Sequence, residues 1–164
     1  MAGKSQIRGK QIKDNTITGD DVNEDTLIMK YFTTHKYTAT STDAAVFVRF
    51  NSAGSNTSGQ VNNKFVAPAD GKLAYVALRS THTPGNTEVA FCKISNGTEE
   101  FGSGAPSADV TEDVSTANTT YLFDFSGANG ATFSSGQVLG IRVNPTNNHG
   151  NVDITCVWEF DWSA

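Results

Sequence analysis

Residues 152–162 read VDITCVWEFDW, and this stretch decides the fold class. Its apolar side chains fall on every second position: Val152, Ile154, Cys156, Trp158, Phe160 and Trp162. Successive side chains of a β-strand point to opposite faces, so this alternation predicts a strand with one buried face. That face is either the middle of a core or, in part, a contact with neighbouring subunits, for which Trp158, Phe160 and Trp162 are the candidates.

Period-two alternation recurs along most of the chain before this stretch. It predicts strands at 46–50, 73–78, 89–94, 121–125 and 139–143, and weaker patterns suggest two more near 31–40 and 61–67. Residues 73–78 are apolar on both faces, which indicates a central strand. No amphipathic helix of about ten residues is visible. About eight strands in this length predict an all-β fold, an antiparallel two-sheet jelly-roll sandwich over residues 31–164.

The segments between the predicted strands are rich in turn residues. Pro68-Ala69-Asp70-Gly71 predicts a turn in which Gly71 adopts positive φ, and Thr83-Pro84-Gly85-Asn86 predicts a hairpin-like loop. The longest stretch without a strand pattern runs from residue 98 to about 118 and contains Asp109, Glu112 and Asp113. A solvated acidic loop explains these acids better than a Ca²⁺ site, because the spacing of a calcium-binding loop is missing.

Composition excludes several classes of function. Gly, Ser, Thr and Asn account for 63 of the 164 residues, which favours β-structure with many turns. A net charge of −5 disfavours general binding to nucleic acid or to a membrane surface. We expect no signal peptide and no membrane span, because no apolar run is long enough.

The residues that usually perform chemistry form no recognisable motif. His35, His82 and His149 are isolated, so we expect surface or loop positions for them, and the nucleophile, phosphate-loop and dinucleotide motifs are absent. Cys92 and Cys156 lie far apart, which favours two buried thiols over a disulfide. The prediction is therefore a protein that is not an enzyme, with no catalytic residue, no metal site and no cofactor.

The first thirty residues follow a different period. Aliphatic side chains recur every five positions, at Ile7, Ile12, Ile17, Val22 and Leu27. Five residues advance an α-helix by about 500°, so these side chains share no helical face, and an odd spacing alternates faces in a strand. Ordering about 25 residues costs roughly 1–2 kcal/mol each, whereas five buried aliphatics return only about 1.5–3 kcal/mol each. We therefore predict that residues 1–30 form an extended attachment arm that needs a partner.

The charges of this arm are segregated. Residues 1–13 contain Lys4, Arg8, Lys10 and Lys13 without an acid, and residues 14–25 contain five acids without a base. The basic tip either docks on an acidic protein surface or is a solvated end. The predicted attachment residues are therefore the basic and aliphatic ones: Lys4, Ile7, Arg8, Lys10, Ile12, Lys13, Ile17, Val22 and Leu27.

Three segments resemble proteins of tailed bacteriophages. Residues 11–22, QIKDNTITGDDV, resemble a motif at the start of fibre and virion-surface proteins. Residues 64–73, KFVAPADGKL, and 156–162, CVWEFDW, resemble the sandwich part of similar phage proteins. Those domains are similar to the trimeric jelly rolls of the tumour-necrosis-factor and C1q type. The resemblance implies a homotrimeric virion-surface protein made in the host cytoplasm, and it transfers no catalytic residue.

Two functions fit this resemblance. The first is a capsid decoration (cement) protein whose arm binds the major capsid protein or another virion protein. The second is a short tail fibre or receptor-binding tip, attached through the same arm and contacting a receptor on the host surface. The five pentads are too few for a fibre shaft, which favours decoration. Whether the arm aliphatics face a shared threefold axis or lie separately on another protein stays open.

Overall fold

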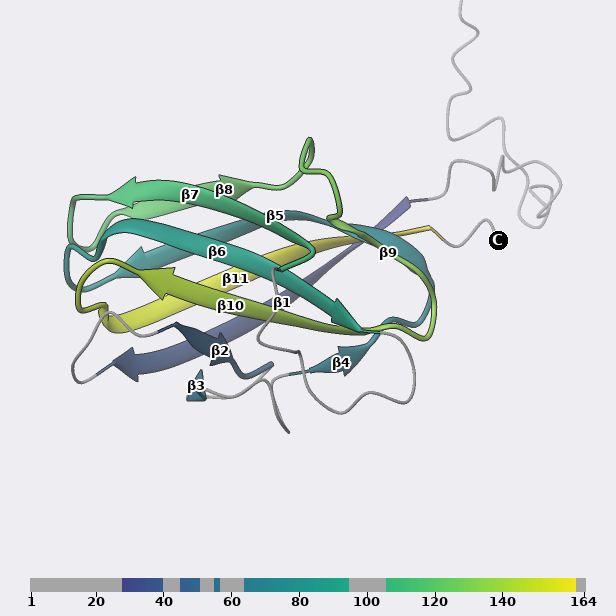
Figure 1. Cartoon of the computed structure of the whole chain (residues 1–164), viewed down its shortest axis with the longest axis horizontal. Helices are drawn as coiled ribbons and strands as arrows, with labels where there is room; N and C mark the ends of the chain where they lie inside the picture. The colour runs from purple at the N-terminus through teal and green to yellow at the C-terminus, as the bar shows by residue number, and fades with distance from the viewer. Residues whose placement is uncertain (1–27, 40–44, 51–54, 57–63, 95–105, 162–164) are drawn as a thin grey trace, which may run out of the picture.

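The computed structural model describes residues 28–39, 45–50, 55–56, 64–94 and 106–161. They form strands in two antiparallel sheets, as predicted (Figure 1). The strands are β1 (Ile28–Ala39), β2 (Val46–Val48), β3 (Ser55–Asn56), β4 (Phe65–Val66), β5 (Asp70–Ser80), β6 (Gly85–Ile94), β7 (Ala108–Val114), β8 (Thr120–Asp124), β9 (Thr132–Phe133), β10 (Val138–Pro145) and β11 (Gly150–Asp161).

Strand order shows the jelly-roll connectivity. Sheet A has the order β1-β11-β5-β8, with β9 paired to β5, and sheet B has the order β3-β2-β10-β6-β7, with β4 paired to β10. The first and last strands lie side by side over their full length, from Ile28 opposite Asp161 to Ala39 opposite Gly150. Most consecutive strands therefore lie in different sheets, and the chain wraps the sandwich as one unit.

The core lies between the sheets and is centred on Trp158. The alternating face of β11 is buried as predicted, and Trp158 is fully buried. Its ring packs at 5.0 Å from that of Phe65, and at 6.0 Å from those of Phe91 and Phe133. The predicted inward faces of 121–125 and 139–143 also point into this core. The two cysteines are buried free thiols, as expected.

Four details differ from the sequence predictions, and each has a physical cause. Residues 108–114 form β7, not a loop: they pair with β6 at the edge of sheet B, where exposed acids suit a strand. Residues 81–84 join β5 in sheet A to β6 in sheet B, so the loop crosses between sheets and is not a hairpin.

The other two differences concern β5. Strict alternation predicts that Leu73 and Tyr75 share one face. Instead, Leu73 pairs with Trp158 and Tyr75 with Val157, so Ala74 is the extra residue of a bulge and Leu73 turns inward. Gly71 is not among the described residues with positive φ. It is needed for space instead, because a Cβ there would lie 2.2 Å from the carbonyl oxygen of Glu159 and 2.8 Å from the Phe133 ring.

Candidate interaction surface

The outer face of sheet A carries an apolar band across its strands. Cross-strand pairing places Phe32 opposite Val157, and Val157 opposite Tyr75. This row ends at Asp124 on β8, and Leu122 lies in the next outward row, opposite Ala77 of β5. Phe32 is 59% exposed and Leu122 is 56% exposed, whereas Val157 and Tyr75 are half-buried. Single exposed apolar residues are ordinary on protein surfaces, so the surroundings of these two decide whether they matter.

Charged rows border the band on both sides. Toward one end, Lys30 and Lys72 both approach Glu159, with Nζ to carboxylate distances of 3.3 and 3.2 Å. Toward the other end, Lys36 and Arg79 both approach Asp153, at 3.4 and 3.6 Å. Each row therefore contains two cations around one carboxylate and keeps a positive excess.

The Glu159 carboxylate is held in its charged form. Partial burial acts to raise the pKa of Glu159, but hydrogen bonds and charges from Lys72 and Lys30 outweigh burial and leave that pKa lowered. The Lys30 ammonium also lies 5.9 Å from the centre of the Tyr75 ring. Lys30 is thus anchored beside the apolar band and does not extend freely into solvent.

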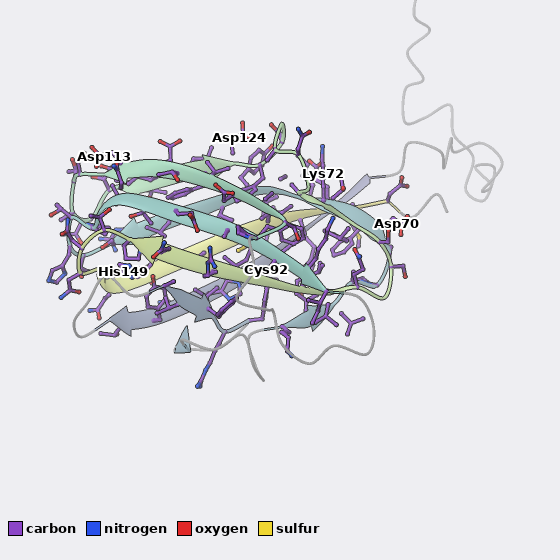
Figure 2. The ribbon with its side chains drawn as sticks, in the orientation of Figure 1. Asp70, Lys72, Cys92, Asp113, Asp124 and His149 are labelled. Carbon is purple, nitrogen blue, oxygen red and sulfur yellow. The ribbon has the colours of Figure 1, made fainter. Side chains whose placement is uncertain are left out.

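The two edges of the sandwich differ in charge. Strand β1 contains Lys30 and Lys36 and no acid. Strands β7 and β8 form the opposite edge and contain four acids and no base: Asp109, Glu112, Asp113 and Asp124. Figure 2 shows Asp113 and Asp124 on this edge. All four are exposed, and none forms an ion pair with another described residue. The acidic edge thus lacks compensating charge within the part of the chain that the structure describes.

One pole of the sandwich carries an open cleft of about 490 Å³. Its lining comes from the start of β5, from β9 and from the end of β11, including Asp70, Lys72 and Asp161. Figure 2 labels Asp70 and Lys72 at this pole. Ile28 pairs with Asp161, so the chain enters the sandwich at the same pole at which β11 ends.

Two buried histidines hold β1 on its inner side. His35 Nδ1 donates to the carbonyl of Arg49 at 2.5 Å, and His35 Nε2 lies 3.0 Å from the Thr33 hydroxyl, which also accepts from Trp158 Nε1. The Tyr37 hydroxyl lies 2.6 Å from His149 Nδ1, and the Ser80 hydroxyl donates to the His149 carbonyl. Burial is the main cause of the lowered pKa of both histidines, to about 4 for His149.

The prediction of surface or loop positions was wrong for His35, which lies on β1 and is 2% exposed. His82 is an exposed loop residue, and His149 lies in the loop between β10 and β11, where it is nevertheless only 1% exposed. The ring nitrogens of His35 and His149 are used mainly within the buried network, although His149 Nε2 has no partner among the described residues. No local pattern announced the network, because it joins residues that are more than a hundred positions apart.

The predicted site residues have mixed outcomes. The attachment residues, Lys4 to Leu27, and also Trp162 lie outside the described residues. Trp158 and Phe160 are 0% and 3% exposed within the single chain, so their side chains fill its own core and offer no surface to another subunit. Phe32 and Leu122 supply exposed apolar surface in their place. Sequence reasoning missed Phe32 because it follows another aromatic residue, Tyr31, so alternation alone does not show which of the two points outward.

The structure offers no sign of a metal centre or a membrane helix in its described parts. Among residues 28–39, 45–50, 55–56, 64–94 and 106–161, no three side chains of His, Cys, Asp or Glu form a group that could hold a metal ion. Within the same ranges, no helix has the length and apolar character needed to cross a membrane.

Comparisons with known proteins leave the family unassigned. No family model matches the chain, and no curated protein matches it. Among solved structures, the crystal structure of YomS, a protein derived from the SPBc2 prophage, is similar, with 13% sequence identity and a TM-score of 0.28. The match covers 82% of this chain and 96% of YomS. A likeness of this size does not establish a shared function.

Proposed function

We propose that this chain is a structural protein of a tailed-phage virion, and specifically a homotrimeric decoration protein that clamps the head through residues 1–27. The observation that carries the proposal is the position of β1, an edge strand that begins at Ile28 beside the end of β11. A segment joined there can bind a partner without displacing any strand of the sandwich. The pole with the cleft faces the head, and the opposite pole faces outward.

The sequence of the arm supports the same role. Its aliphatic side chains recur every five residues and cannot form a core alone. An extended segment of this length provides an interface of ordinary size on a partner, and three arms linked in one trimer gain avidity. The proposed role is structural and involves no catalysis, cofactor or metal.

Deleting residues 1–27 tests this role directly. The truncated protein is added to undecorated heads, and bound protein is quantified after sedimentation of the particles. We expect binding to be lost while the circular dichroism spectrum of the sandwich is retained. Undiminished binding by the truncated protein would refute the clamp.

A double substitution separates the aliphatic spacing from the mere presence of the arm. Ile12→Asp with Ile17→Asp removes two of the five aliphatics and should abolish binding to heads. Thr16→Asp with Thr18→Asp is the matched control, since it adds the same charge to the same part of the arm and keeps every aliphatic residue. Equal binding by the two variants would mean that the aliphatic period has no role in attachment.

The second candidate is a short tail fibre or receptor-binding tip. It is favoured by the Thr16-Ile17-Thr18 segment, which resembles the start of fibre proteins. In that case the arm binds the tail and the distal loops contact the host surface. Copy number separates the candidates, because decoration proteins are present in far more copies per virion than fibres. Quantified bands from a gel of purified virions decide between them.

A further inference from the structure

We propose that the two edges of sheet A bind each other in neighbouring copies, so that the chains join head to tail into a closed ring. The basic edge is β1 with its Lys30, Phe32 and Lys36, and the acidic edge is β8 with the adjoining β7. The inference deepens the proposed function and rests on it for the number of copies, because a homotrimer needs a contact between chains that Trp158 and Phe160 cannot supply.

Charge is the first argument for this contact. The basic edge has a positive excess, because Lys30 shares Glu159 with Lys72 and Lys36 shares Asp153 with Arg79. The acidic edge has four exposed carboxylates without a cation in the described chain: Asp109, Glu112, Asp113 and Asp124. Surfaces of opposite sign attract each other and orient the approach of two molecules.

Apolar surface at the same two places is the second argument. Phe32 is the exposed apolar residue of the outward basic edge, between Lys30 and Lys36, and Leu122 is its counterpart two residues before Asp124. Both side chains point outward from sheet A, because Thr33 and Phe123 beside them are buried. A contact between the edges removes both from water, with charged groups around them, which is the usual arrangement of an interface core and rim.

The complementarity points to a second copy of this chain and to one type of symmetry. Both halves of the contact are on one molecule, at opposite edges of the sandwich, so each copy offers one of each. Such a contact is heterologous, and repeated rotation either closes into a ring or continues as a filament. A contact of an edge with its own kind is disfavoured, because it would place like charges together.

Charge reversal on the full-length protein tests the contact in the absence of virions. One variant combines Lys30→Glu with Lys36→Glu, a second combines Asp113→Lys with Asp124→Lys, and a third carries all four changes. Sedimentation velocity measures the association constant of each. We expect each two-residue variant to associate at least about tenfold more weakly, and the four-residue variant to regain most of the loss. A recovery of association in the four-residue variant cannot come from new ion pairs within one chain, because the glutamates at positions 30 and 36 still lie beside Glu159 and Asp153.

The remaining measurements cover the other outcomes. Thermal unfolding of each variant checks that the sandwich is intact, and Phe32→Ser with unchanged charge should also weaken association. A wild-type chain that stays monomeric, filaments of open length, or four-residue variants that do not recover would each overturn the inference. Assembly into rings that fail to bind heads would instead overturn the proposed function and leave the contact standing.

Discussion

The two outer faces of the sandwich both carry apolar side chains, but these side chains differ in how far they are exposed to solvent. On sheet B, Phe47 and Cys92 point away from the main core and are still only 7% exposed, with Ile94 and Val138 packed against them. On sheet A, Phe32 and Leu122 are more than half exposed. Sheet B therefore closes this cluster within its own chain, although Val66 on β4 of the same sheet is 61% exposed, whereas Phe32 and Leu122 stay open on sheet A.

This difference indicates on which face a partner would gain most from contact. An outer face that is closed within its own chain gains nothing from a partner, whereas exposed apolar groups beside unbalanced charge gain from being covered. The same logic applies to ion pairs. Arg142 and Glu88 on sheet B form a short, half-buried pair at 2.8 Å, whereas the pairs around Asp153 on sheet A are longer and more exposed.

The largest expected effect comes from placing the same charge on the two faces. Phe47→Asp should lower the free energy of unfolding by about 3–5 kcal/mol, because it removes a buried ring and buries an unpaired carboxylate. Phe32→Asp should change it by less than about 1 kcal/mol, because the side chain is already exposed. Urea unfolding at a concentration low enough to keep the chain monomeric measures both. Similar losses for the two variants would remove the distinction between the faces.

The inner faces of the strands could be predicted from sequence because burial on one side imposes strict alternation. Leu139, Ile141 and Val143 are fully buried, as their spacing indicated, and Arg142 between them points outward. The same reasoning placed the alternating face of β11 in the core. These strands are central in their sheets, so neighbours on both sides prevent a slip in register.

The outer faces and the edges could not be predicted in this way. Strand β7 was missed because only Ala108 and Val114 are fully buried, and its acids resemble those of a loop. The bulge at Ala74 turns the side chain of Leu73 into the core, against the face that strict alternation assigns to it. The basic and acidic edges belong to strands far apart in sequence, and only the sheet order places them at opposite edges. Long-range pairing, not local pattern, creates the candidate surface.

The second-largest expected effect is a loss of stability in acid, which should reach sheet A before sheet B. The pKa of His149 is lowered from 6.5 to about 4 by burial, and that of His35 is also lowered, so the folded state keeps both rings neutral. Between these values the unfolded chain binds more protons, and stability therefore falls as the pH drops from about 6.5 toward about 4. His149 alone accounts for up to about 3 kcal/mol over this range.

Hydrogen exchange followed by mass spectrometry locates this effect. Both histidines contact β1 or its side chains, so protection of β1 should decrease with acid while that of β6 and β10 is retained. The variant His149→Gln should flatten the dependence above about pH 5, where the lowered pKa of Glu159 does not yet contribute. Equal loss of protection in both sheets would mean that acid does not act through these histidines.

The smallest effect distinguishes the ion pairs of the two faces. Glu88→Gln should destabilise the fold by about 1–2 kcal/mol, because it leaves the half-buried Arg142 without its counter-charge, whereas Lys36→Gln should cost no more than about 0.5 kcal/mol.

The reactivity of the Cys92 thiol gives an independent signal for the same pair. Burial is the main reason why its pKa is raised to about 11, with Arg142 lowering and Glu88 raising that pKa. Glu88→Gln should therefore lower this pKa and speed alkylation of Cys92 in native conditions, measured by peptide mass spectrometry. Lys36→Gln, on the other face, should leave the alkylation rate of Cys92 unchanged. A faster reaction in both variants would show that the thiol responds to a general loss of stability and not to the charges of Arg142 and Glu88.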